Sequence, residues 1–287
     1  MTDVKLAIDC ACGCGENPLW HETEQRLYFV DNAAGKLLRF DPRSGEIEQL
    51  YQAGGWLGGF TFQEDGSLLL VMDSGVIAVR RGDEVSFLVE GVAELSETMF
   101  NDLIADPEGR VFSGTMRRTL QPTGLYRLDC DGSLTCLLDD AILSNGLGFT
   151  PDRRGLYFTD TLRRNIYRFD YDRATGAITS RQTLVTVPEG EGFPDGMTVD
   201  AEGYIWSARW AGGRIARYAP DGMLEREITI PTGKVTSLTF AGPDYTDIYV
   251  TTAGGNTRDL DGDLAGAIFH LNLGIRGLPE FKSRIGL

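Results

Sequence analysis

Histidine is scarce in this chain, which has only two, His21 and His270, among 287 residues. A zinc site with three histidine ligands is therefore excluded. His270 lies in the alternating segment AIFHLN, where a hydrogen-bonded structural histidine is expected rather than a catalytic one.

Positive charge is also in short supply, because 27 Lys and Arg stand against 42 Asp and Glu, for a formal net charge of −15. Nucleic acids and anionic membrane surfaces attract basic proteins, so neither is an expected partner. No stretch is long and apolar enough to span a bilayer, and the N-terminus lacks the pattern of a secretory signal. We expect a cytoplasmic protein, a monomer or weak homo-oligomer, that binds small molecules or cations.

The five cysteines are too few and odd in number for a disulfide framework, so free thiols are expected. Cys10, Cys12 and Cys14 alternate in CACGC, and on a strand they would share one face. Their spacing differs from the C-x-x-C pairs of zinc and redox sites. We interpret them as small buried apolar residues, with a soft-metal or redox role as the alternative.

No window of helix length has a convincing 3.6-residue period, whereas one short apolar run recurs roughly every 45 residues, the length of a propeller blade. The six copies are RLYFVD (26–31), SLLLVMD (67–73), RVFSGTM (110–116), GLYFTD (155–160), YIWSAR (204–209) and DIYVTT (247–252). Turns with acidic residues or glycine precede the first five runs, and a further strand and hairpin follow several of them. The pattern predicts an all-β, six-bladed β-propeller with four antiparallel strands per blade, one domain over residues 1–287. A pair of β-sandwiches is the alternative, but it requires no repeated register.

Acidic and amide residues precede four of the six runs, and they are Glu16, Asn101 with Asp102, Asn145 and Asp195. In a propeller the turns that enter the innermost strands meet at one mouth of the central channel, so we expect these side chains to converge there. Asp195, between Pro194 and Gly196, is expected at a sharp turn. Ordinary turn chemistry is the alternative for each of them. Carboxylate and amide oxygens suit hard cations such as Ca²⁺, Mg²⁺ or Mn²⁺.

The segments GENPLW, FNDLIADPEGRVFSGTM, SNGLGFTPD, LYFTDT, FPDGMTVDAEGYIWSA and AIFHLNLGIRGLP, in this order, resemble the SMP-30/gluconolactonase/LRE family along essentially the whole chain. The resemblance implies a six-bladed propeller that binds one divalent cation on its axis and often hydrolyses lactones. It implies that Glu16, Asn145 and Asp195 are metal ligands, with Asp195 also the general base, and that Asn101 is a substrate-side amide. Ca²⁺ is the first expectation, with Mg²⁺, Mn²⁺, Zn²⁺ or Fe²⁺ as alternatives.

The chain departs from the sugar-lactone members of that family at Met99, where they have an arginine two residues before the asparagine. A thioether cannot replace the donors of a guanidinium, so a standard aldonolactone is in question as the substrate. Arg117 and Arg118 stand where some members place an acidic residue. Trp56, in GGWLGGF, is expected either to form an apolar wall of the channel beside Met99 or to pack in the core.

The predicted reaction is the opening of a small lactone by water beside the cation. In it Asp195 takes the proton of the water, and Asn101 donates a hydrogen bond to the oxygen where charge develops. Two alternatives stay open: hydrolysis of another ester, such as a phosphotriester, and a regulatory propeller that binds the cation without turnover.

Overall fold

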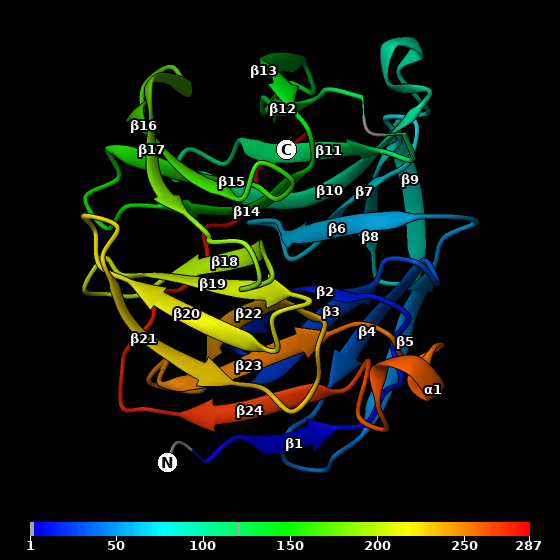
Figure 1. Cartoon of the computed structure of the whole chain (residues 1–287). Helices are drawn as coiled ribbons and strands as arrows, with labels where there is room; N and C mark the ends of the chain where they lie inside the picture. The colour runs from blue at the N-terminus through cyan, green and yellow to red at the C-terminus, as the bar shows by residue number, and fades with distance from the viewer. Residues whose placement is uncertain (1–2, 120) are drawn as a thin grey trace.

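The computed structural model describes residues 3–119 and 121–287, and it contains six sheets of four strands each. Figure 1 shows the sheets arranged in a ring, with one strand of each toward the middle. Neighbouring strands within each sheet are antiparallel. The six-bladed β-propeller predicted from the repeated runs is therefore confirmed.

Each blade is named here in chain order, with its strands given from the innermost to the outermost. Blade 1 consists of β2 (Gly15–His21), β3 (Arg26–Asp31), β4 (Lys36–Phe40) and β5 (Ile47–Gln52). Blade 2 consists of β6 (Leu57–Phe62), β7 (Leu68–Met72), β8 (Ile77–Arg81) and β9 (Glu84–Val89). Blade 3 consists of β10 (Thr98–Ala105), β11 (Val111–Arg117), β12 (Thr123–Leu128) and β13 (Leu134–Ala141).

The second half of the ring repeats this order. Blade 4 consists of β14 (Ser144–Phe149), β15 (Gly155–Asp160), β16 (Asn165–Asp172) and β17 (Ala177–Thr186). Blade 5 consists of β18 (Phe193–Val199), β19 (Ile205–Trp210), β20 (Arg214–Tyr218) and β21 (Leu224–Thr229). Blade 6 consists of β22 (Val235–Ala241), β23 (Asp247–Thr252), β24 (Ile268–Asn272) and, as its outer strand, β1 (Lys5–Ile8).

The ring is closed by the two ends of the chain, because β1 pairs with β24 and places Lys5 opposite His270. The His270 ring is 2.8 Å from the Asp247 carboxylate, which fits the structural role expected for this histidine. The helical segments are short: a 3₁₀ turn, η1 (Ala93–Leu95), and one turn of α-helix, α1 (Arg258–Asp261). Among the described residues, no helix has the length and apolarity needed to cross a membrane.

The recurring runs are the second strands of the blades, and both faces of these strands are buried between neighbouring blades. In β7, Leu70 and Met72 pack with Val30 on the side of blade 1, whereas Leu69 and Val71 pack on the side of blade 3. This two-sided burial explains why SLLLVMD is a continuous apolar run instead of an alternating one. Burial of these faces removes apolar surface from water at each junction between blades.

The site residues correct one detail of the sequence analysis, because they lie on the innermost strands and not in turns entering them. The pairing of each innermost strand with its neighbour is interrupted by a β-bulge. Asp195 is the third residue of β18, next to the bulge between Pro194 and Met197. Gly196 is required by close packing: a Cβ there would lie 2.3 Å from Ser237 Oγ and 2.8 Å from the Thr236 carbonyl oxygen.

The cysteine segment also differs from expectation. Cys10 and Cys12 lie in irregular chain before β2, where Ala11 has a positive φ of 50°, so no strand aligns the three thiols on one face. Only Cys12 is fully buried, and its Sγ is 3.3 Å from that of Cys10. All five thiols are free, as predicted.

Candidate metal and substrate site

Four side chains from four blades line one cavity of about 450 Å³ at one end of the channel, and they are Glu16, Asn101, Asn145 and Asp195. They lie on β2, β10, β14 and β18, and each is between 4% and 7% exposed. These side chains are distant in sequence, and the propeller brings them together.

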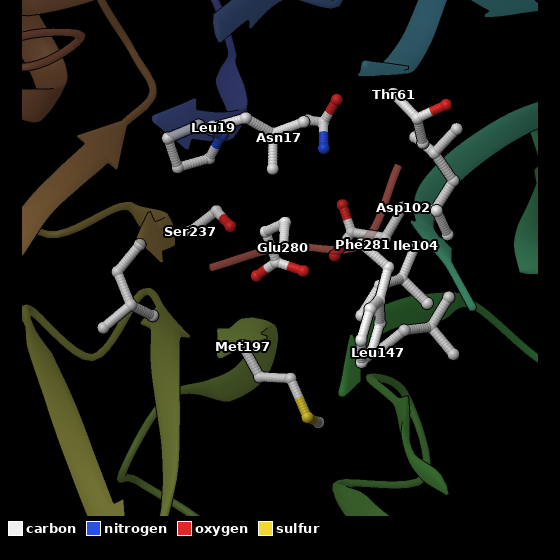
Figure 2. Close-up of a pocket in the computed structure, with 14 residues that line it drawn as sticks. Asn17, Leu19, Thr61, Asp102, Ile104, Leu147, Met197, Ser237, Glu280 and Phe281 are labelled. Carbon is white, nitrogen blue, oxygen red and sulfur yellow. The ribbon is translucent and has the colours of Figure 1, made fainter. Parts of the chain in front are cut away.

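The bulges explain this convergence, because a bulge locally re-aims side chains that would otherwise face a neighbouring blade. We call the six residues at this position the first ring: Glu16, Gly58, Asn101, Asn145, Asp195 and Thr236. The residues that follow them form the second ring: Asn17, Gly59, Asp102, Gly146, Gly196 and Ser237. Four first-ring residues, Glu16, Asn101, Asn145 and Asp195, line the large cavity. Three second-ring residues, Asn17, Asp102 and Ser237, line a smaller cavity instead (Figure 2).

The two asparagines of the first ring form a fixed network. Asn101 Nδ2 donates to Asn145 Oδ1 and to the Ser144 carbonyl, both at 2.9 Å. Asn145 Nδ2 in turn donates to Thr161 Oγ1 at 2.8 Å. Both N–H groups of Asn101 are therefore engaged, and the Asn145 oxygen is held toward Asn101.

The two carboxylates of the first ring have few partners. Glu16 accepts one hydrogen bond, from the Asn17 backbone N–H at 3.2 Å, and Asp195 accepts none from residues 3–119 and 121–287. Burial, followed by the charges of Asp102 and Asp195, raises the pKa of Glu16 well above its usual range. Burial, followed by the charge of Asp102, does the same to the pKa of Asp195, with the Arg209 guanidinium opposing it.

This donor set fits a hard divalent cation. Two desolvated carboxylates on one axis are costly unless a positive charge accompanies them, and the Asn145 amide adds a third oxygen ligand. Within the described parts of the chain, no group of three or more His, Cys, Asp and Glu side chains is arranged to hold a metal. The candidate ligands are instead two carboxylates and an amide: Glu16, Asp195 and Asn145.

The raised pKa of Asp195 predicts that, in cation-free protein, the stability difference between the wild type and Asp195→Asn depends on pH. Above pH 4 the unfolded aspartate ionises while the folded one holds its proton, so folding is increasingly penalised as pH rises toward the folded pKa. Asp195→Asn removes that penalty and should melt at least about 2 °C above the wild type at pH 8, with no gap near pH 4. Thermal unfolding in chelator at both pH values measures it, with the exposed Asp83→Asn as control. An equal gap at both pH values would contradict this origin.

The cavity walls are mostly apolar, and sequence reasoning identified only Trp56 among them. Trp56 lines the cavity and donates its indole N–H to the Phe100 carbonyl at 2.8 Å. The other apolar walls are Met116, Leu143, Leu162, Phe193 and Trp210. Phe193 stands two residues before Asp195 on β18 and opposite Trp210, so strand alternation was the signal available for it.

Met99 is buried in β10 and is not among the residues that line the large cavity. It pairs with Met116, which does line that cavity. Met99 itself lines a neighbouring cavity of about 110 Å³, together with Asp73 and Arg118. The side chain at position 99 therefore lies outside the large cavity, next to its cross-strand neighbour Met116, which lines it.

A six-bladed propeller with carboxylate and amide oxygens in a mostly apolar cavity on its axis is the class of protein defined by this fold and site. Residues 14–254 match the family described as SMP-30/Gluconolactonase/LRE-like region. The chain belongs to this family.

Among the chain's relatives is the pentonolactonase XacC of Haloferax volcanii, 45% identical over 99% of each chain. The 6-deoxy-6-sulfogluconolactonase of Pseudomonas putida is 35% identical over 93% of each chain. Among solved structures, the luciferin-regenerating enzyme superimposes with a TM-score of 0.91 at 26% identity, over 99% of this chain and 100% of the other.

Proposed function

We propose that this protein is a divalent-cation-dependent lactonase that opens a small lactone ring to the hydroxy acid. The observation that carries the proposal is the convergence of Glu16, Asn145 and Asp195 on one cavity, where the Asp195 carboxylate has no partner among the described residues. The relatives named as lactonases support the same reaction class. In it, the oxygen of water adds to the lactone carbonyl carbon and the ring C–O bond breaks.

Glu16, Asn145 and Asp195 would hold the cation, which supplies Lewis acidity at the lactone carbonyl and lowers the pKa of nearby water. The Asp195 carboxylate would take the proton of the attacking water. That proton is then available for the ring oxygen that leaves. Ca²⁺ is the first candidate, because the donors are all oxygen.

Asn101 has a more constrained role than the sequence suggested. A hydrogen bond from Asn101 to the developing oxyanion requires one of its N–H groups to leave Ser144 or Asn145. In the present arrangement, its amide orients the Asn145 oxygen as a cation ligand. Trp56 is held by its bond to the Phe100 carbonyl and forms part of the substrate wall.

The substrate proposal combines the relatives with the walls of the cavity. The names of both relatives refer to sugar-derived lactones. The aromatic and aliphatic walls favour lactones with fewer hydroxyls or with an apolar face. Met99, which lies outside the cavity beside its wall residue Met116, adds no hydrogen-bond donor there. Five-carbon aldonolactones and their deoxy analogues are therefore the first compounds to assay.

The test is a panel of substrates with chelator-stripped protein and added Ca²⁺, Mg²⁺, Mn²⁺ or Zn²⁺. The panel contains a pentonolactone, gluconolactone, a deoxylactone and a phosphotriester. Cation-dependent opening of at least one lactone is expected. Turnover of the phosphotriester alone would favour the rival esterase, and cation binding without any turnover would favour a regulatory propeller.

Specificity at position 99 gives a separate prediction. Met99→Arg should shift the preference toward polyhydroxylated lactones by about tenfold or more, because a hydrogen bond to a charged group contributes about 1.5 to 3 kcal/mol. The ratio of kcat/KM for a sugar lactone over its deoxy analogue measures the shift. Met99→Leu, which adds no donor, is the control. An unchanged ratio in folded Met99→Arg would show that this position does not set specificity.

A further inference from the structure

Two thiols of the CACGC segment lie in contact, and the proposed lactonase mechanism uses neither of them. Cys12 Sγ donates a hydrogen bond to Cys10 Sγ at 3.3 Å, and Cys10 Sγ donates to the Gly266 carbonyl at 3.2 Å. The third thiol of the segment, Cys14, lines the large cavity instead. The contact between Cys10 and Cys12 therefore needs its own explanation.

The backbone holds this pair of thiols in place. The two cysteines lie between β1 and β2, and the chain turns between them at Ala11, where φ is 50°. The Cys12 N–H donates to the Gly266 carbonyl at 2.9 Å, and the Cys12 carbonyl accepts from the Gly255 N–H at 2.9 Å. A Cβ at position 266 would lie 2.3 Å from the Cys12 carbonyl oxygen, so only glycine allows this approach. The turn is thus fixed against the segment that precedes β24.

The two thiols differ in exposure and in acidity. Cys12 is only 2% exposed, whereas Cys10 is half-buried and can be reached from solvent. The hydrogen bond from Cys12 lowers the pKa of the Cys10 thiol, against the effect of burial. The same hydrogen bond, together with burial, raises the pKa of Cys12. Because the thiolate is the nucleophile, Cys10 is the reactive thiol and Cys12 is its protonated partner.

A metal site is a poorer explanation of the pair. A structural zinc ion takes four ligands, most often cysteine and histidine. Over residues 3–119 and 121–287, no group of three or more His, Cys, Asp and Glu side chains is arranged to hold a metal. Two sulfur atoms in direct contact, one acidified by the other, instead suit redox chemistry.

We propose that Cys10 and Cys12 form a redox-active dithiol, which a hydroperoxide oxidises reversibly to a disulfide. For the bond to form, the two Sγ atoms must approach from 3.3 Å to about 2 Å, and they already face each other. The inference is independent of the lactonase proposal, since it uses none of Glu16, Asn145 and Asp195.

The oxidation takes two steps with hydrogen peroxide. In the first, the Cys10 thiolate attacks one peroxide oxygen, so an S–O bond forms, the O–O bond breaks, and hydroxide leaves and takes up a proton as water. In the second, Cys12 Sγ attacks the sulfenic sulfur of Cys10, so the S–S bond forms, the S–O bond breaks and a second water leaves. The two thiols together lose two electrons and two protons, which the peroxide accepts.

Peptide mass mapping tests the proposal. Reduced protein is treated with stoichiometric hydrogen peroxide, alkylated with iodoacetamide under denaturing conditions and digested with trypsin. Cleavage after Lys5 and Arg26 gives one peptide that contains Cys10, Cys12 and Cys14. This peptide should lose two hydrogens and carry one alkyl group, on Cys14, instead of three. Dithiothreitol added before alkylation should restore all three.

Variants identify the role of each thiol. Cys12→Ser, which removes the second thiol, should stop at the Cys10 sulfenic acid and be labelled there by dimedone. Cys10→Ser should form no disulfide in this peptide. Cys136→Ser, which removes an exposed thiol, is the matched control and should still form the bond between Cys10 and Cys12. If Cys12→Ser fails to fold, Cys12→Ala should carry the same dimedone label.

Two results would overturn the redox pair. One is a peptide that still carries three alkyl groups after peroxide treatment, and the other is a disulfide that joins Cys14 to either cysteine. The measurement reports thiol chemistry and not turnover. Its outcome therefore stands apart from the outcome of the lactone assays.

Discussion

Asp195→Ala should lower the hydrolysis of the best lactone by at least about a hundredfold and weaken cation binding at the first ring at the same time. The carboxylate is buried and accepts no hydrogen bond from the described residues, so its oxygens are available as both ligand and base. Asp195→Asn separates the two roles, because an amide oxygen can coordinate but cannot take a proton at neutral pH. This variant should keep part of the cation affinity and lose most of the rate.

Steady-state kinetics and calcium titration of the same preparations measure both effects. The exposed Asp83→Asn is the control for loss of one negative charge and should behave like the wild type. If Asp195→Ala hydrolysed lactones at the wild-type rate and retained the first-ring cation, Asp195 would serve only the packing of β18. Equal losses of rate and affinity in Asp195→Asn would argue against a role as base.

The sequence predicted the architecture well because each blade repeats one strongly apolar strand. In β7 and its equivalents both faces are buried, so the run stands out against the alternating strands around it. The closure of the ring was not predicted, because β1 is a short exposed strand whose partner, β24, lies at the other end of the chain. Its four residues, KLAI, are exposed or half-buried, and a run this short does not signal that the segment pairs with another strand.

The predicted polar residues of the site lie together because the repeat fixes their position relative to the second strand. What the sequence could not give was the local geometry of the bulges, which turns Asn101 toward one cavity and Asp102 toward the other. For the same reason the sequence suggested a donor role for Asn101, whereas both of its N–H groups are engaged by blade 4. Hydrogen-bond partners across blades depend on three-dimensional packing, which residue spacing does not encode.

Met99 was misplaced by the sequence analysis, because its motif position predicted direct contact with substrate. Its side chain instead lies beside Met116, which lines the cavity.

Removal of the cation should have the second large effect, on both activity and stability. Chelator treatment should reduce lactone hydrolysis at least about a hundredfold, because Lewis acidity and lowered water pKa are lost together. An ion that binds only the folded state contributes about 2.7 kcal/mol at a hundredfold excess over Kd, so its removal should lower Tm by about 5 °C or more. Scanning calorimetry with and without Ca²⁺ measures this shift.

A variant assigns the thermal shift to the first ring. In Asp195→Ala the calcium-dependent rise in Tm should be much smaller than in the wild type, because one of the two first-ring carboxylates is lost. Full lactonase activity in protein shown by elemental analysis to be free of metal would contradict the proposed mechanism. If lactonase activity recovered with Zn²⁺ but not with Ca²⁺, the proposed mechanism would stand with zinc as its ion. Glu16, Asn145 and Asp195 offer oxygens that can bind several divalent cations.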